Sequence, residues 1–302
     1  MHPEKQYLNL ISNIIKHGIK EKGRNGNTKT VMGALMRFPL DNNKIPFVTT
    51  KKLAWRTCFK ELFWFMNGET DNKKLKKQNV KIWNGNASRE FLDSRGLRHY
   101  EEDDLGPIYG YQWRHFDLPY RNSHHYNNWN FKNLNNLPYI KRRYSDQLQN
   151  IIDSLQNKDE RNSRRLIMSA WNPNQIKDMA LPPCHILSQF SVLNNKLYCN
   201  MYQRSGDVGL GIPFNIASYS LLTIILAKHC NLEPGEFIHH IGNAHIYQEH
   251  EEALKTQILR EPKEFPKCFI KHKYTNIENY SLKDVKIIDY NYHDEIKMDM
   301  KV

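Results

Sequence analysis

The spacing of apolar residues predicts a helix near the start of the chain. Leucine and isoleucine recur there every three or four positions, so one side of a helix over residues 7–20 would be apolar. The residues on that side are Leu10, Ile11, Ile14, Ile15 and Ile19. This pattern indicates a helix that packs on the core of a globular protein.

Three further helices are expected. Residues 53–67 are strongly aromatic and are followed by Gly68, a residue that suits a helix C-terminus. Ser145 is a good N-cap for a helix that begins there. Pro213 can occupy the first turn of a helix, and residues 216–230 continue it as a mostly apolar, hence central, helix. The inward positions expected after Ser145 are Leu148, Ile151, Ile152 and Leu155.

Short apolar runs between polar segments predict strands. Residues 165–171 form one such run, bounded by charge and proline. Residues 186–193 and 196–202 flank two asparagines, a pair suited to positive φ, and so predict a hairpin. Helices and antiparallel strands in this order favour an α+β fold, with a mixed, largely antiparallel β-sheet layered with helices.

Residues 121–143 depart from this periodicity, because they are polar, rich in asparagine and aperiodic. We expect one domain over residues 1–302, with residues 121–143 as a surface insertion. A solvated loop is the favoured interpretation of this insertion. A basic, aromatic contact with nucleic acid is the alternative.

Composition narrows the class of protein only modestly. The chain has 39% hydrophobic and 25% charged residues, which is ordinary for a soluble globular protein. Its longest apolar run, residues 221–227, is too short to cross a bilayer, and its first residues lack the apolar core of a secretion signal. Five irregularly spaced cysteines favour a reducing compartment, so we expect a cytoplasmic protein, with the nucleus as the alternative.

The net charge of +12 favours anionic partners. Nucleic acid is one candidate class, and a small phosphorylated substrate with an acidic cofactor is another. A bias towards lysine, asparagine and isoleucine spread over the whole surface is a third explanation. Charge alone does not choose among them.

The first candidate for chemistry is the run Leu181-Pro182-Pro183-Cys184-His185. Two prolines restrict the backbone and place Cys184 at the mouth of a predicted strand. A thiolate is the nucleophilic form of cysteine, and nearby cations favour it. His185 need not be its partner, because neighbours on a strand point to opposite faces. Buried structural thiols are the expectation for the other cysteines, namely Cys58, Cys199, Cys230 and Cys268.

Two motifs follow within thirty residues. Arg204 and Ser205 together suit a phosphate, and Gly206 would let backbone approach a ligand; a polar strand end is the alternative. Asn215 stands at the start of the apolar helix and can read a pyrimidine edge with one donor and one acceptor. Helix capping alone would also explain Asn215.

The order and closeness of these three motifs resemble the thymidylate synthase family. The likeness extends over nearly the full chain and begins near residue 3, so no fused reductase domain is expected ahead of it. The motifs that carry the resemblance, besides residues 182–185, 203–207 and 213–219, are Arg24 and residues 49–52, 61–65, 81–83, 106–110, 163–165 and 242–247.

The resemblance implies an enzyme, a methyltransferase that converts dUMP to dTMP with 5,10-methylenetetrahydrofolate as co-substrate and no metal. Cys184 would attack the uracil ring, with Arg204 favouring its thiolate. Glu61 would manage proton transfer at the ring carbonyl, Tyr109 would help to remove the proton from carbon five, and Asn215 would read the uracil edge. Without the resemblance, Glu61 could be a charge that faces solvent. A carboxylate among aromatic residues is nevertheless a plausible acid of raised pKa.

The resemblance also implies the binding residues and a homodimer formed through one face of the sheet. Arg164 and Arg165 would reach the phosphate in the partner's site. The other residues expected at the nucleotide are Arg24, His185, Gln203, Arg204, Ser205, Asp207, Asn215, His245 and Tyr247. Those expected at the folate are Ile82, Trp83, Asn86, Asp207, Leu210, Gly211, Phe214 and Met300.

The chain departs from the family pattern at a few positions. Asn243 stands where aspartate is usual, and Lys301 precedes the final Val302 where a small residue is usual. The tail around His293 also lacks the usual prolines. These changes bear on how the C-terminus closes over the ligands. Two alternatives remain: a pyrimidine nucleotide hydroxymethylase of the same superfamily, and an RNA-binding regulatory protein. Asn215 disfavours dCMP as the substrate of such a hydroxymethylase.

Overall fold

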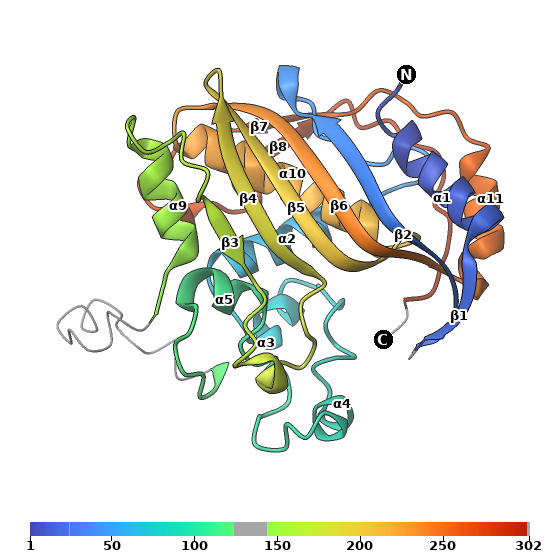
Figure 1. Cartoon of the computed structure of the whole chain (residues 1–302), viewed down its shortest axis with the longest axis horizontal. Helices are drawn as coiled ribbons and strands as arrows, with labels where there is room; N and C mark the ends of the chain where they lie inside the picture. Colours follow the sequence, from blue (N-terminus) through green and yellow to red (C-terminus); the bar gives the residue numbers. More distant parts are fainter. Residues whose placement is uncertain (24, 124–143, 301–302) are drawn as a thin grey trace.

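A six-stranded sheet forms the centre of the molecule. The computed structural model describes residues 1–23, 25–123 and 144–300. Strand order in the sheet is β1-β2-β6-β5-β4-β3, and a second sheet pairs β7 with β8 (Figure 1). Within the main sheet β5 and β6 run parallel, and the other neighbours run antiparallel. The strands are β1 (Ile19–Gly23), β2 (Gly26–Pro39), β3 (Ile167–Ser169), β4 (His185–Leu193), β5 (Lys196–Asp207), β6 (Glu233–Tyr247), β7 (Lys267–Ile270) and β8 (Val285–Ile288).

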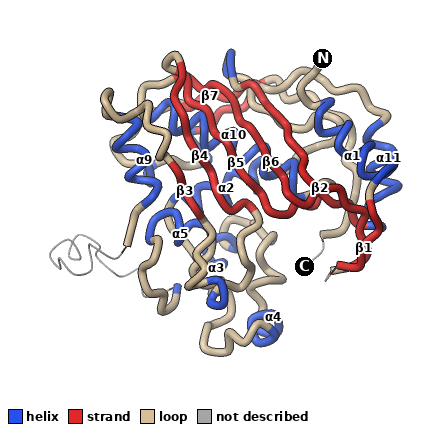
Figure 2. The backbone as a smooth tube through the Cα atoms, viewed as in Figure 1, coloured by secondary structure: helices blue, strands red, loops and turns tan. Residues whose placement is uncertain are grey.

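Helices cover one face of this sheet. Figures 1 and 2 show the strands crossing in front of α10 and α2, with no helix over the near face. The helices are α1 (Lys5–His17), α2 (Trp55–Met66), α3 (Asn72–Lys76), α4 (Arg89–Ser94), α5 (Tyr109–His115), α9 (Gln147–Gln156), α10 (Gly211–His229) and α11 (Glu251–Ile258). Short 3₁₀ turns are η1 (Asp41–Asn43), η2 (Ile176–Asp178), η3 (Gln248–His250), η4 (Ile277–Asn279) and η5 (Leu282–Asp284). The α+β class expected from the sequence is confirmed.

Helix α10 is the centre of the core. It is long and apolar enough to span a membrane, but most of it is buried against β5, β6 and α2. Burial of nearly every side chain around its circumference explains why its sequence is apolar on all sides. The prediction of a central helix here is confirmed, with a start at Gly211.

The first predicted helix ends earlier than expected. Helix α1 buries Leu10, Ile11 and Ile14 as predicted, but Gly18 leaves the helix with an extended ψ of 136°. A Cβ at Gly18 would lie 2.4 Å from the carbonyl oxygen of Ile14, so only glycine fits this exit. Ile19 is therefore not on the apolar helix face; it begins β1 and is 70% exposed.

One further predicted helix boundary, the start of α9, is corrected, and another, the end of α2, is confirmed. The N-cap of α9 is Asp146, whose carboxylate accepts from the backbone N–H of Gln149 at 3.0 Å; Ser145, the predicted cap, lies one residue outside. Gly68 has a φ of 70°, as a residue that ends α2 in the left-handed region should. The four inward residues predicted for α9 are all buried.

The predicted hairpin is confirmed as β4 and β5. Asn194 and Asn195 have φ values of 49° and 61°, so both residues adopt the positive φ that a two-residue turn of this kind requires. Strand β5 continues five residues beyond the predicted end at residue 202, to Asp207. This extension carries the Arg204-Ser205 motif along the sheet to its end.

The insertion predicted at residues 121–143 lies mostly outside the described residues, which stop at residue 123 and resume at residue 144. Arg24, Lys301 and Val302 lie outside them as well.

Candidate active site

Strand β5 carries three of the predicted residues, Gln203, Ser205 and Asp207. Burial alternates along the strand up to Gln203 and then shifts by one residue, since Gly206 is buried whereas Ser205 and Asp207 are partly exposed. Gly206 faces Ile212 of α10, so Ser205 and Asp207 lie on the other side of the strand. In the parallel pairing with β6, Ser205 lies beside Asn243 and Asp207 beside His245. The end of these two neighbouring strands therefore collects the polar residues of two separate sequence motifs, residues 203–207 and 242–247.

Cys184 lies directly before β4, at the same end of the sheet. Its backbone N–H donates to the hydroxyl of Tyr109 at 2.8 Å, and its carbonyl oxygen accepts from the N–H of Arg204 at 2.8 Å. Cys184 is partly exposed, whereas the other four cysteines are buried, as expected. The accessible thiol is thus the one that the sequence motif selected.

Arg204 lies against the turn that carries Cys184. Its Nε donates to the carbonyl of Pro183 at 2.8 Å, and Nη2 donates to that of Pro182 at 3.0 Å. These bonds hold a permanent positive charge beside the turn that carries the nucleophile. A cation in that position favours a thiolate.

His185 is buried in the aromatic interior behind Cys184. Its Nδ1 is 2.7 Å from the hydroxyl of Tyr219, and its ring stacks on Tyr109 with centroids 4.1 Å apart. Burial lowers the pKa of His185 to about 3, so its ring is neutral. A neutral imidazole here orders the ring of Tyr109 and does not pair with the thiolate as a cation.

Tyr109 is held by contacts on both sides. Burial raises the pKa of its phenol well above the usual value, and the neighbouring Cys184 raises it further. Tyr109 therefore keeps its proton near neutral pH. The role expected of Tyr109 at carbon five would therefore need a separate proton acceptor, such as water, that its hydroxyl orients.

Glu61 and Trp83 form the acid side of the site. The indole N–H of Trp83 donates to Oε1 of Glu61 at 2.7 Å. Burial raises the pKa of Glu61 to about 7, although the bond from Trp83 lowers it in part. The expectation of a carboxyl with a raised pKa is confirmed, and the alternative of a solvent-facing charge on α2 is wrong.

Asn215, the residue expected to read the base, is not the cap of its helix. It is the fifth residue of α10, whose N-cap is Leu210, so the capping interpretation is wrong. Its Oδ1 accepts from Nε2 of Gln203 at 3.1 Å. The side chain of Gln203 thereby positions the amide that is expected to read the base.

His245, the residue expected at the sugar, has a defined orientation. Its Nδ1 lies 3.0 Å from Oδ1 of Asn243 and 3.5 Å from the hydroxyl of Ser205. Asn243 thus supplies the acceptor that aspartate would supply, and its departure from the family pattern keeps this hydrogen bond. Tyr247 meets the ring of His245 edge-on, with centroids 5.4 Å apart.

Asp207 is one of the residues expected at the folate. Its Oδ1 accepts from the N–H of Gly209 at 2.8 Å, which fixes the loop that leads into α10. Trp83 and Asn86 are nearly buried, Ile82, Leu210, Gly211 and Phe214 are partly exposed, and Met300 is 52% exposed.

Lys51 lies next to Asp207, and no role was predicted for it. Its ammonium donates to the carbonyl of Gly209, beside Asp207, and the side chain is 5% exposed. Burial lowers the pKa of Lys51 to about 8, while Asp207 opposes that shift. The only signal in the sequence was its place in the motif at residues 49–52.

Gly206 has a different role from the one expected. A Cβ at this position would lie 2.3 Å from Cδ1 of Ile212, so the missing side chain lets α10 approach β5. The space at Gly206 belongs to the core and not to a ligand.

The remaining phosphate residues are not brought to Cys184 within one chain. Arg164 and Arg165 are exposed on the loop before β3. Arg24 lies outside the described residues, as does the C-terminal pair. Among the described residues, no cluster of histidine, cysteine and carboxylate side chains could hold a metal ion.

Comparison with known proteins agrees with this geometry. The sequence model of the thymidylate synthase family matches residues 5–302. The chain is 46% identical to the human protein named thymidylate synthase, with 100% of this chain and 91% of that protein aligned. It is 47% and 48% identical to rice and maize proteins named as bifunctional dihydrofolate reductase-thymidylate synthases, the rice one as putative. The whole chain aligns with them but spans only 58% and 55% of their lengths. The chain belongs to the thymidylate synthase family.

Proposed function

We propose that the protein methylates dUMP to dTMP with 5,10-methylenetetrahydrofolate and releases dihydrofolate. The observation that carries this proposal is the arrangement around Cys184. Arg204 holds the turn that carries this accessible thiol. Tyr109, which bonds to the backbone of Cys184, lies beside Trp83, the partner of the raised-pKa carboxyl of Glu61. Gln203, the partner of the Asn215 amide, pairs across the strands with the residue that follows Cys184. Few other reactions need a thiolate nucleophile, a proton donor and a pyrimidine-reading amide together.

In this reaction the thiolate of Cys184 adds to carbon six of the uracil ring. The electron pair displaced from the 5,6 double bond then makes carbon five nucleophilic, and Glu61 donates a proton towards the ring carbonyl that gains charge. Reduced folate, when bound, supplies the one-carbon unit and the hydride. After carbon five loses its proton, expulsion of the Cys184 sulfur restores the free enzyme. Arg204 and Ser205 hold the substrate phosphate during these steps.

The site residues fit a reduced folate. Asp207 can accept hydrogen bonds from a pterin ring, and Trp83 offers an aromatic surface next to Glu61. Lys51 places a buried cation next to Asp207, which suits a ligand that also carries carboxylates.

Incubation with 5-fluoro-dUMP and methylenetetrahydrofolate should leave a stable adduct on the peptide that contains Cys184. Fluorine cannot leave as a cation in place of the proton, so the reaction should stop at the covalent stage. Mass spectrometry of digested protein detects the adduct, and the Cys184→Ser variant is the control. A product assay with dUMP completes the test: hydroxymethyl-dUMP and tetrahydrofolate in place of dTMP and dihydrofolate would overturn the proposal in favour of a hydroxymethylase.

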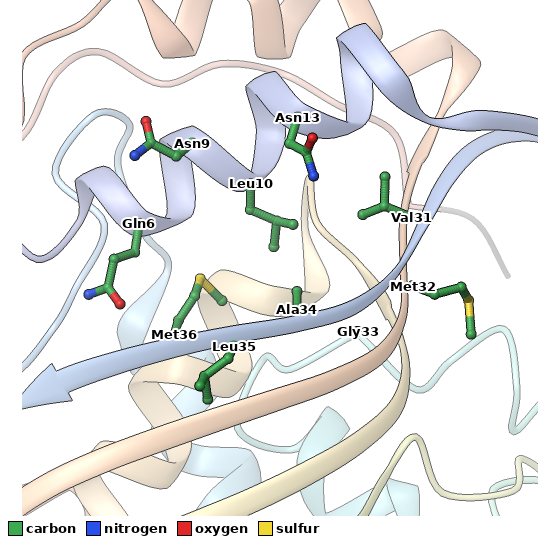
Figure 3. Close-up of a pocket in the computed structure, with 10 residues that line it drawn as sticks. All are labelled: Gln6, Asn9, Leu10, Asn13, Val31, Met32, Gly33, Ala34, Leu35 and Met36. Atoms are coloured by element: carbon green, nitrogen blue, oxygen red, sulfur yellow. The ribbon is translucent and has the colours of Figure 1, made fainter.

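We also propose that two copies of the chain pair through the helix-free face of the sheet. The pairing register places Leu35, Tyr202 and Leu187 in one row across the sheet, with Ile167 in the next row. These side chains are 53%, 44%, 36% and 43% exposed. An exposed apolar row of this kind supports an interface. Beside it, a hollow of about 290 Å³ between α1 and β2 is lined by Leu10, Ala34 and Leu35 (Figure 3).

Mixing two inactive variants should restore activity if Arg164 and Arg165 act in the partner's site. One variant carries Cys184→Ser, and the other carries Arg164→Ala with Arg165→Ala. Random exchange of subunits would rebuild roughly a quarter of the sites, because each heterodimer has one complete site. Steady-state rates after unfolding and refolding the mixture measure this recovery. No recovery, with heterodimers shown by native mass spectrometry, would mean that the arginines serve their own subunit.

We propose a cytoplasmic location, and the five free thiols support it because reducing compartments preserve them. RNA binding stays a prediction from the net charge, since the insertion on which it depends lies mostly outside the described residues. Salt-dependent binding of RNA to the Cys184→Ser variant would support it.

A further inference from the structure

The amide of Gln203 joins three groups at the base of the site. Its Nε2 donates to the backbone carbonyl of Ser205 at 2.9 Å and to Oδ1 of Asn215 at 3.1 Å. Its Oε1 lies 2.9 Å from Nε2 of His239. His239 is on β6, beside Met201 of β5, and its side chain is fully buried.

The direction of each hydrogen bond in this chain follows from the carbonyl of Ser205. A backbone carbonyl can only accept, so the nitrogen of the Gln203 amide must face it. The oxygen of that amide then faces His239, which must carry its proton on Nε2. The second hydrogen of the Gln203 nitrogen points to Asn215, so the atom of Asn215 that receives it must be the oxygen. This order does not depend on which way either amide was first assigned.

His239 fits the role of a neutral donor. Burial lowers its pKa to about 3, and the neighbouring His185 and His240 lower it further, so the ring carries one proton. No described residue gives its Nδ1 a hydrogen-bond partner. If the side chain at residue 239 served only to fill the core, an apolar side chain could do the same without the free-energy cost of an unpaired nitrogen. The one polar contact that His239 makes among the described residues is with Gln203.

We propose that His239 is a specificity-determining positioning residue: it holds Gln203 in the place where the amide of Gln203 keeps the oxygen of Asn215 on one side, so that the site accepts uracil and rejects cytosine. This inference rests on the proposed function and concerns the same site. Uracil presents a carbonyl oxygen at carbon four and an N–H at position three. The amide of Asn215 matches both only while its oxygen stays on the side of Gln203 and of the N–H.

Cytosine reverses these two groups, with an amino group at carbon four and a bare nitrogen at position three. To match cytosine, the amide of Asn215 must turn over and present its nitrogen to Gln203. Two donors would then face each other, because the carbonyl of Ser205 prevents the amide of Gln203 from turning as well. The bond from His239 to Oε1 keeps Gln203 in the position where this conflict arises.

The test measures the ratio of dissociation constants for dCMP and dUMP by calorimetry. Wild-type protein should prefer dUMP by at least about 100-fold, since the wrong base leaves buried polar groups unpaired. His239→Leu removes the donor, so Gln203 can shift and the ratio should fall at least tenfold. His239→Gln offers an N–H at a similar reach and should keep the ratio within threefold of wild type.

His229 provides a matched control, because it is another buried histidine, in contact with Tyr280 and not with Gln203. His229→Leu should lower the melting temperature without changing the ratio. A folded His239→Leu protein with the wild-type ratio would overturn the inference. Wild-type protein that binds neither nucleotide and forms no dTMP would instead overturn the proposed function.

A second measurement does not depend on the folding of the leucine variant. In ¹⁵N-histidine spectra of wild-type protein, His239 should show a protonated Nε2 and an unprotonated Nδ1 throughout pH 6 to 8. Its signals are identified by their loss in His239→Gln. A proton on Nδ1, or on both nitrogens, would contradict the order of hydrogen bonds on which the inference depends.

Discussion

Replacing Cys184 by serine should lower the rate of dTMP formation by at least about 10⁴-fold, because a hydroxyl does not ionise to a nucleophile in this site. Binding of dUMP should stay within a few-fold of wild type. The two hydrogen bonds that position residue 184 use its backbone N–H and carbonyl, with Tyr109 and Arg204 as partners, so serine retains both. Single-turnover rates with saturating folate, combined with calorimetry of dUMP, separate the two effects.

Cys268→Ser is the matched control for this experiment. Cys268 is buried on β7, where burial raises the pKa of its thiol to about 12. Serine at residue 268 should lower the melting temperature and leave the rate within about twofold, since the thiol takes no part in the chemistry. A Cys184→Ser rate within tenfold of wild type would remove Cys184 from the mechanism.

The parts of the fold that the sequence predicted are those whose cause is local. The inward residues of α9 and the Asn194-Asn195 turn depend on helical period and on positive φ, and both are confirmed. Strand β6 was not predicted as a strand. Its pairing with β5 is parallel and connects residues that lie far apart in the sequence, so no turn or hairpin pattern marks it.

The residues of the candidate site divide in the same way, into those that a sequence motif identifies and those that depend on tertiary contacts. Cys184 and Arg204 were identified by motif, and the structure adds the physical link between them, which is a set of bonds from Arg204 to the turn that carries Cys184. The roles of Lys51 and His239 could not be derived, because each depends on burial next to one partner from another element. A lysine after two threonines and a histidine in a strand have many ordinary explanations.

The departures from the family pattern are also clearer in the structure. Asn243 keeps an oxygen within hydrogen-bond reach of His245, so the substitution changes charge and not geometry. Near the tail, His250 lies 2.8 Å from the carbonyl of Asp299, and His293 donates its backbone N–H to Thr49. The C-terminal segment is thus attached near the site as far as Asp299, without the prolines that usually flank His293.

Replacing Glu61 by glutamine should lower kcat by about 10²–10⁴-fold, the usual contribution of a positioned proton donor. Glutamine can still accept from the indole of Trp83, so the fold of the site should persist. With a pKa of about 7, Glu61 is mostly protonated below that pH and ionised above it. Wild-type kcat should therefore fall as pH rises through 7, and this inflection should be absent in the variant. An unchanged inflection in Glu61→Gln would assign it to another group.

The same carboxyl should make stability depend on pH. The folded state holds the proton of Glu61 up to about pH 7, whereas the unfolded chain loses it near the ordinary value of 4.5. The folded state therefore binds more protons in that window, and the free energy of unfolding should fall as pH rises from about 4.5 to 7. Because Glu61 is partly exposed, solvent screening reduces the expected loss to on the order of 2 kcal/mol.

Glu61→Gln should match wild type near pH 4 and exceed its stability at pH 8, as measured by urea unfolding. Glu102→Gln, at an exposed site, is the control and should show no such difference between the two pH values. Equal stability of wild type and Glu61→Gln at pH 8 would show that Glu61 ionises without cost, and that it does not hold the proton that the reaction requires.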